Sequence, residues 1–80
     1  MRLHLFMTQH CHLCELAIEE LKIVRETTHP LLEWEVIDIA YDDALAHQYE
    51  TTIPVLKRID KTAQLLWPFS AQHIIDFVCE

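Results

Sequence analysis

Residues 8–21 read TQHCHLCELAIEEL and place two cysteines, Cys11 and Cys14, at the point where a helical pattern begins. The preceding segment, RLHLFM (2–7), has apolar residues in both of its alternating sets, which is typical of a strand covered on both faces. The following segment, HLCELAIEELKIVRETT (12–28), gathers its apolar residues on one helical face. This stretch therefore predicts a strand, a short loop and a helix, with the cysteine pair at their junction.

The remainder of the chain predicts alternating strands and helices around this unit. The order is β-α-β-α-β-β-α, with further strands at 34–39, 54–59 and 64–67, a short helix at 43–50 and a last helix at 71–79. The first strand–helix–strand unit predicts a right-handed parallel crossover, and the short connection between the last two strands predicts an antiparallel hairpin. We therefore expect an α/β fold, a four-stranded mixed sheet with helices on both faces, as one domain over residues 1–80.

The composition argues against several classes of function. The formal net charge is −7 and the six Lys and Arg are scattered along the sequence, so we expect no nucleic-acid partner. The chain has no glycine, which excludes glycine-rich phosphate loops. No apolar run reaches the ~20 residues of a membrane span, and the N-terminus does not resemble a signal peptide. We therefore expect a cytoplasmic protein without a membrane partner.

The position of the cysteine pair has a chemical consequence. Cys11 falls at the end of the loop and Cys14 about one turn into the helix, where free N–H groups and the helix dipole stabilise an anion on the first sulfur. The thiolate is the attacking species in disulfide exchange. We predict that Cys11 is the catalytic nucleophile and that Cys14, less exposed, is the resolving thiol.

Two other interpretations of the pair remain open at this stage. Three cysteines are too few, and odd in number, for a disulfide framework, but two of them could be small buried apolar residues. A structural zinc site needs four ligands, and a site made of His10, Cys11, His12 and Cys14 alone would be cramped. We predict no metal site. A protonated His10 or His12 would favour the Cys11 thiolate, although both also fit as exposed polar loop residues.

With CHLC (11–14) after one strand and TTIPV (51–55) before another, the chain resembles the thioredoxin superfamily and is most similar to short bacterial glutaredoxin-like proteins. The resemblance covers nearly all 80 residues, and WPF (67–69) before the last helix adds to it. It implies a thiol–disulfide oxidoreductase that reduces protein disulfides or glutathione mixed disulfides. The residues between the cysteines, His12 and Leu13, are then expected to contact the substrate.

The resemblance also implies that the Ile53–Pro54 peptide bond is cis and faces the cysteine pair. A cis bond makes a tight, fixed bend. It would leave the backbone N–H and C=O of Ile53 free to pair with an extended substrate, as an added strand does. Ile53 and Pro54 are therefore expected substrate-binding residues.

One departure from the family pattern concerns glutathione. Glutaredoxins that bind glutathione usually carry a Gly-Gly pair before the last helix, whereas this chain reads LLWPFSAQH (65–73), where Ser70 fits best as a helix cap. We expect no tightly bound cofactor, and glutathione is a candidate co-substrate. The expected partners are protein or glutathione thiols and disulfides, and the expected state is a monomer.

Two other functions fit the same residues. The first alternative is a non-catalytic binding or redox-sensing module that docks a partner along Ile53. The second is metal or iron–sulfur carriage by Cys11 together with an external thiol or a second subunit. We rank the oxidoreductase first, the binding module second and metal carriage third.

Overall fold

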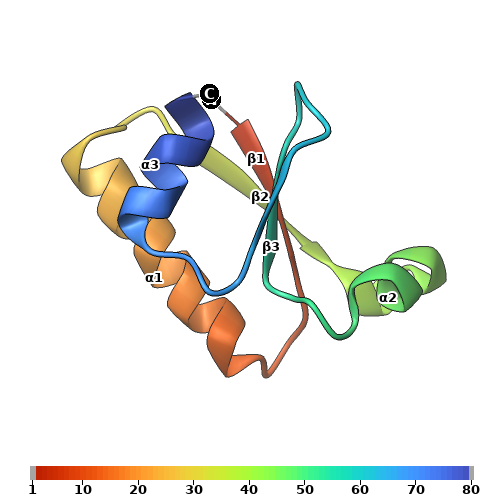
Figure 1. The fold of residues 1–80 in the computed structure, drawn as a ribbon. Coiled ribbons are helices and arrows are strands. Elements are labelled where there is room, and N and C mark those ends of the chain that lie inside the picture. Colours follow the sequence, from red (N-terminus) through yellow and green to blue (C-terminus); the bar gives the residue numbers. More distant parts are fainter. Residues whose placement is uncertain (1, 80) are drawn as a thin grey trace.

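The computed structural model describes residues 2–79 and has the predicted order of elements (Figure 1). One 3-10 turn, η1, is added after the second strand. The elements are β1 (Arg2–Met7), α1 (His12–Thr27), β2 (Glu33–Asp38), η1 (Ile39–Tyr41), α2 (Asp43–Tyr49), β3 (Val55–Arg58), β4 (Gln64–Leu66) and α3 (Ala71–Cys79).

The sheet is mixed, with strand order β2-β1-β3-β4. β1 and β2 are parallel, whereas β3 is antiparallel to both β1 and β4, which confirms the predicted crossover and hairpin. β3 begins at Val55, one residue later than predicted, because Pro54 has no N–H to donate to a strand ladder. The parallel pairing of β1 and β2 brings their carboxyl ends to the same edge of the sheet, where α1 starts.

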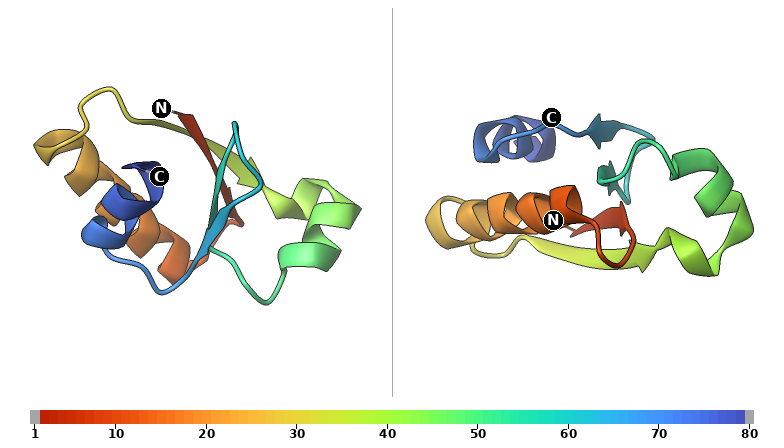
Figure 2. Two further views of the ribbon diagram at one scale, coloured as in Figure 1. Left: turned by 45° about the horizontal axis from the view of Figure 1, so that its top comes forward. Right: turned by 90° about the horizontal axis from the view of Figure 1, so that it is seen from below.

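One face of the sheet is covered by α1 and α3 (Figure 2). Leu3 and Leu5 of β1 and Leu56 of β3 are fully buried beneath these helices. The helices contribute the faces that their spacing predicted. The buried helical residues are Cys14, Ala17, Leu21 and Val24 of α1 and Ile74, Phe77 and Val78 of α3.

The opposite face is covered at one end by α2 (Figure 2). Phe6 of β1 and Val55 of β3 point to this side, where they pack with Ile39 and Tyr49 in a second cluster. Asp42 caps α2 by accepting a hydrogen bond from the Leu45 N–H at 3.1 Å. Helices therefore lie on both faces of the sheet, as predicted.

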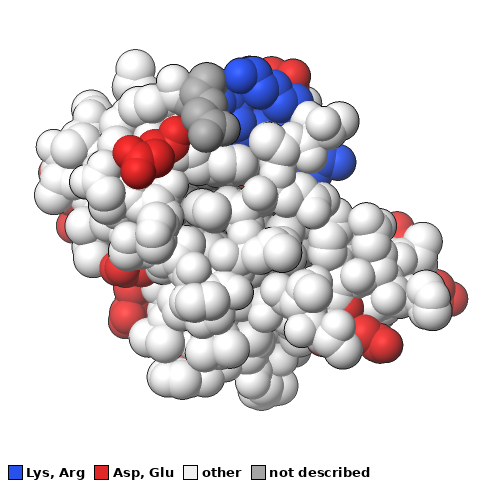
Figure 3. Space-filling model, in the orientation of Figure 1, with Lys and Arg blue, Asp and Glu red and all other residues white. Residues whose placement is uncertain are grey.

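The fold gathers basic residues that are scattered along the sequence. Lys57 and Arg58 pair across the sheet with His4 and Leu3, next to Arg2, and Lys61 lies in the turn that follows. Figure 3 shows the resulting group of basic side chains at the end of the molecule that carries the β3–β4 turn. The scattered sequence positions were therefore a poor guide to how these cations group in space. Among residues 2–79, no helix is long and apolar enough to cross a membrane.

Candidate active site

Cys11 is the N-cap of α1. Its backbone is extended (φ −97°, ψ 106°), and its sulfur accepts a hydrogen bond from the Cys14 N–H at 3.2 Å. This is the place usually taken by a Ser, Thr or Asp oxygen, which satisfies an N–H that has no partner within the helix. The Cys11 carbonyl also begins the helical ladder by accepting the Glu15 N–H at 3.1 Å. The N-terminus of α1 therefore directs a donor at the Cys11 sulfur.

Cys11 and Cys14 are joined in a disulfide, with their Cα atoms 5.2 Å apart. The two residues differ in accessibility: Cys14 is fully buried under the sheet, whereas Cys11 is partly exposed. The predicted difference in exposure is therefore present in the structure. An external molecule can reach the pair only through the Cys11 sulfur.

His10, directly before the pair, has a left-handed backbone with φ 61°. This conformation costs a residue with a Cβ about 1–2 kcal/mol and is usually left to glycine, which the chain lacks. The His10 side chain is exposed, so the conformation serves the path of the backbone. It turns the chain from the end of β1 into the N-cap of α1.

His12 and Leu13, between the two cysteines, are both exposed. The His12 Nδ1 lies 3.7 Å from a Glu15 carboxylate oxygen, and 79% of the His12 side chain is accessible. Leu13 is 44% exposed, beside the reactive pair. The site therefore presents an apolar side chain and an imidazole next to Cys11.

The Ile53–Pro54 peptide bond is cis, and Pro54 is buried. Val55 pairs with Phe6, so Pro54 lies at the carboxyl end of β1, the end from which the chain continues to Cys11. The fold therefore brings TTIPV (51–55) to the same end of the sheet as the cysteine pair.

The expectation that the Ile53 N–H is free is wrong. This N–H donates to the Tyr49 carbonyl at 3.1 Å, because the last turn of α2 continues into the loop. The same carbonyl accepts the Thr52 N–H at 2.9 Å and its hydroxyl at 3.2 Å. Among the described residues no backbone donor meets the Ile53 carbonyl. Of the two backbone groups of Ile53, only the carbonyl therefore remains available to pair with an incoming polypeptide chain.

Tyr49 therefore positions the Pro54 loop, a role that the sequence did not reveal. Its ring is 5% exposed and stacks on Phe6 of β1, with ring centroids 4.7 Å apart and planes 16° apart. The spacing of the predicted helix 43–50 places Tyr49 on one face with Leu45. Its carbonyl gives no signal in a sequence, since every residue carries one.

One known protein family matches nearly the whole chain. The sequence profile of the Glutaredoxin-like domain (DUF836) matches residues 2–78. The chain belongs to this glutaredoxin-like family. A search of the curated proteins found no match.

Three solved structures resemble the glutaredoxin-like chain over most of its length. Protein XcR50 from X. campestris is 30% identical with a TM-score of 0.80, over 96% of this chain and 95% of that one. Protein Ne2328 from Nitrosomonas europaea is 26% identical with a TM-score of 0.75, over 95% and 88%. Thioredoxin 1 from Thermosipho africanus TCF52B, 20% identical with a TM-score of 0.67 over 98% and 90%, shares the fold. The fold is therefore thioredoxin-like, as the sequence predicted.

The segment before α3 in this glutaredoxin-like chain has a second cis proline, at Trp67–Pro68, which the sequence did not predict. Trp67 contacts Phe69 edge to face, with ring centroids 4.9 Å apart, and Phe69 is buried in the main core. The Ser70 hydroxyl accepts the His73 N–H at 3.4 Å, which fits the predicted helix cap. Core packing thus accounts for Phe69, and helix capping accounts for Ser70.

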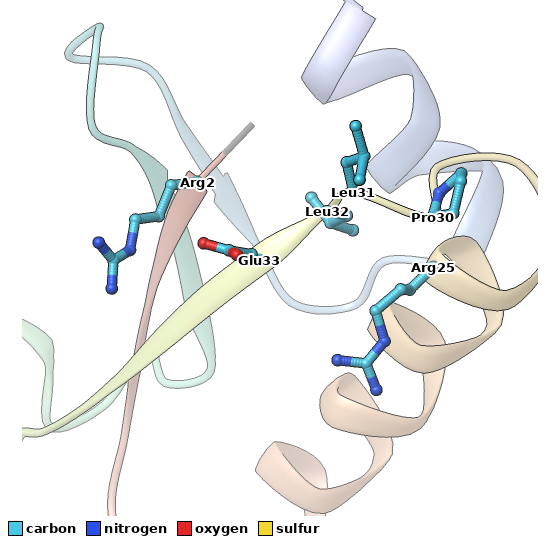
Figure 4. Close-up of a pocket in the computed structure, with 6 residues that line it drawn as sticks. All are labelled: Arg2, Arg25, Pro30, Leu31, Leu32 and Glu33. Atoms are coloured by element: carbon cyan, nitrogen blue, oxygen red, sulfur yellow. The ribbon is translucent and has the colours of Figure 1, made fainter.

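A hollow of about 450 Å³ opens far from the cysteine pair, at the last turn of α1 and the start of β2. Figure 4 shows Arg2 and Arg25 at opposite sides of the hollow, with Glu33 between them. The two guanidinium groups therefore do not converge on one ligand. This hollow is separate from the cysteine pair.

The third cysteine, Cys79, is exposed at the end of α3, and its sulfur lies 3.8 Å from His29 Nε2. It is thus an accessible thiol. Across residues 2–79, no group of three or more His, Cys, Asp or Glu side chains is arranged to hold a metal ion.

Proposed function

We propose that this glutaredoxin-like protein is a thiol–disulfide oxidoreductase with Cys11 as nucleophile and Cys14 as resolving thiol. The observation that carries the proposal is the arrangement of the pair: a partly exposed Cys11 at a helix N-cap, bonded to a fully buried Cys14. Helix N-termini stabilise thiolates, and an accessible thiolate attacks disulfides. Burial restricts Cys14 to the second step.

The proposed reaction transfers two electrons from the protein to the substrate. The Cys11 thiolate attacks one substrate sulfur, a bond forms between them, and the other substrate sulfur leaves as a thiolate. The Cys14 thiol then loses its proton to solvent, and the resulting thiolate attacks the Cys11 sulfur and releases the second substrate thiolate. Solvent protonates the leaving groups. The protein finishes with the Cys11–Cys14 disulfide, the form present in the structure.

Each cycle then needs a thiol reductant that supplies two electrons. Glutathione is one candidate co-substrate, and a dithiol protein is another. Protein or glutathione disulfides are the proposed partners, and no tightly bound cofactor is required. We propose that the protein acts as a monomer in the cytoplasm, where C-x-x-C pairs serve catalysis more often than structure.

We propose that the substrate lies across the cis proline and the cysteine loop. The Ile53 carbonyl would accept a hydrogen bond from the substrate backbone, and Pro54, which lacks an N–H, would not compete for it. His12 and Leu13 would contact the substrate beside the attacked sulfur. Exposure of both side chains, at the same end of the sheet as Pro54, supports this placement.

The test is reduction of a peptide disulfide by variants that all carry Cys79→Ser, so that Cys11 and Cys14 are the only thiols. Cys11→Ser should lose reduction. Cys14→Ser should stop at a mixed disulfide on Cys11, visible by mass spectrometry as one added peptide. Equal rates for Cys11→Ser and its parent would contradict the assignment. A pair that oxidises and reduces without turnover would favour the redox-sensing alternative.

A further inference from the structure

Among residues 2–79, the end of the molecule that carries Cys11 has no Lys or Arg. Four parts of the fold meet there: the loop after β1 with the first turns of α1, the carboxyl end of β2 with α2, the Pro54 loop, and the segment between β4 and α3. In the sequence these are residues 7–21, 37–54 and 65–73, which contain no Lys or Arg. Their acidic residues are Glu15, Glu19, Glu20, Asp38, Asp42, Asp43 and Glu50.

The cations lie at the other end. Arg2 starts β1, while Lys57, Arg58 and Lys61 occupy the end of β3 and the turn after it. Lys22 and Arg25 lie in the second half of α1, roughly 16 Å and 21 Å along the helix from Cys11. Figure 3 shows basic side chains at the turn end and none at the opposite end of that face, where α1 begins.

This separation of charge determines which charges a substrate meets as it approaches Cys11. Charges within a Debye length of about 8–10 Å act on an incoming molecule, and those beyond it are largely screened. A disulfide that approaches Cys11 therefore meets carboxylates, such as that of Glu15 one turn along α1, and no permanent cation. The groups there that can become cationic are the histidines His10, His12, His47 and His73.

Two features favour a polypeptide as the occupant. The exposed Leu13 offers apolar contact beside the pair, and the Ile53 carbonyl offers an acceptor for a backbone N–H. Glutathione carries two carboxylates and one ammonium group and is therefore a net anion, and this end provides no Lys or Arg to receive the carboxylates. A chain with neutral or basic flanks meets no such electrostatic repulsion.

Building on the oxidoreductase function proposed above, we infer that the Cys11–Cys14 site acts on disulfides in neutral or basic polypeptide segments and selects against acidic ones, glutathione mixed disulfides included. Glu15 is then a specificity-determining residue, since it is the acidic side chain in the first turn of α1. It acts through charge and takes no part in the exchange of sulfur bonds.

The test uses two peptides that are identical except for two lysines or two glutamates beside a single cysteine, each blocked as a mixed disulfide with 2-mercaptoethanol. The Cys79→Ser protein, in its reduced form, is reacted with each peptide at pH 8. At low ionic strength the lysine peptide should react about tenfold faster than the glutamate peptide. The ratio should fall towards one in about 0.5 M salt, where charges are screened.

Paired variants locate the source of the selectivity. Glu15→Lys should lower the lysine-to-glutamate ratio several-fold. Glu26→Lys makes the same change of charge on the same helix, roughly 16 Å further from Cys11, and should leave the ratio unchanged. If both variants shift the ratio equally, net charge and not the local field sets it, and the role of Glu15 is refuted.

The outcomes separate this inference from the function on which it rests. Equal rates for the two peptides at low salt, or a faster glutamate peptide, would overturn the charge selectivity and leave the oxidoreductase intact. A glutathione mixed disulfide that reacts as fast as the lysine peptide would do the same. Failure of every peptide to react would overturn both proposals.

Discussion

The Tyr49 carbonyl accepts a hydrogen bond from the Ile53 N–H at 3.1 Å, and the next peptide bond, Ile53–Pro54, is cis. The ring of Tyr49 stacks on Phe6 of β1. One residue thus ties the proline loop to α2 through its backbone and to the sheet through its side chain. The position of Pro54 depends on packing in the second apolar cluster.

Replacing Tyr49 should therefore be costly for stability. Tyr49→Ala removes a buried ring that stacks on Phe6, and we expect the free energy of unfolding to fall by about 3–5 kcal/mol in urea titrations. Tyr41 is 82% exposed and provides the control: Tyr41→Ala should stay within about 0.5 kcal/mol of the parent. A loss for Tyr49→Ala as small as the loss expected for Tyr41→Ala would mean that packing of the Tyr49 ring does not stabilise the fold.

The backbone at His10 predicts an unusual benefit from glycine. With φ at 61°, His10→Gly relieves about 1–2 kcal/mol of conformational cost and adds about 0.5–1 kcal/mol of unfolded-chain entropy. The net expectation is a gain of up to about 1 kcal/mol in the free energy of unfolding, whereas His10→Val should lose stability. A clear loss in His10→Gly would show that the imidazole makes a stabilising contact.

The Arg58–Asp60 pair predicts a dependence of stability on pH. Hydrogen bonds from the buried Arg58 guanidinium at 3.1 and 3.0 Å lower the pKa of Asp60. Because the folded-state pKa is lowered, the stabilisation is present above the unfolded value of about 3.9 and is lost as pH falls through the folded value.

The measurement is the melting temperature of the parent and of Asp60→Asn between pH 7 and strong acid. The parent should melt higher at neutral pH, and the difference should vanish in acid. Glu26→Gln, which removes an exposed carboxylate of α1, is the control and should show no comparable change. A difference that persists unchanged into acid would rule out a charge effect.

Cys79 predicts covalent dimers under oxidising conditions. It is exposed and free, while the other two cysteines are paired with each other. We expect a disulfide-linked dimer in non-reducing electrophoresis of the oxidised parent and none from Cys79→Ser. A dimer that persists in Cys79→Ser would have to use Cys11, the other accessible sulfur, and would disappear in Cys11→Ser.

Periodic patterns predicted the elements well because each is a local property of the chain. The helical face that includes Leu21 and the alternation in residues 2–7 follow from the geometry of a helix and a strand. The cysteine pair at the first strand–helix junction followed in the same way. The thioredoxin-like arrangement was implied by the family resemblance that CHLC (11–14) and TTIPV (51–55) carry.

Features that depend on contacts between distant segments could not be predicted in this way. The hydrogen bond to the Tyr49 carbonyl depends on how α2 leads into the proline loop. The grouping of Lys57 and Arg2 depends on strand register. The cis bond before Pro68 and the left-handed His10 have no local signal, because proline is usually trans and histidine usually right-handed.

Full burial of Cys14 has a consequence for the order of events. A thiol without exposed surface can neither capture a molecule from solution nor be captured by one, so the first covalent link to any outside partner must form at Cys11. In the proposed reaction, access alone therefore sets the order of the two half-reactions, even if the two sulfurs were equally reactive. In the folded protein with its cysteine pair reduced, a bulky alkylating reagent should therefore label only one cysteine of the pair, Cys11.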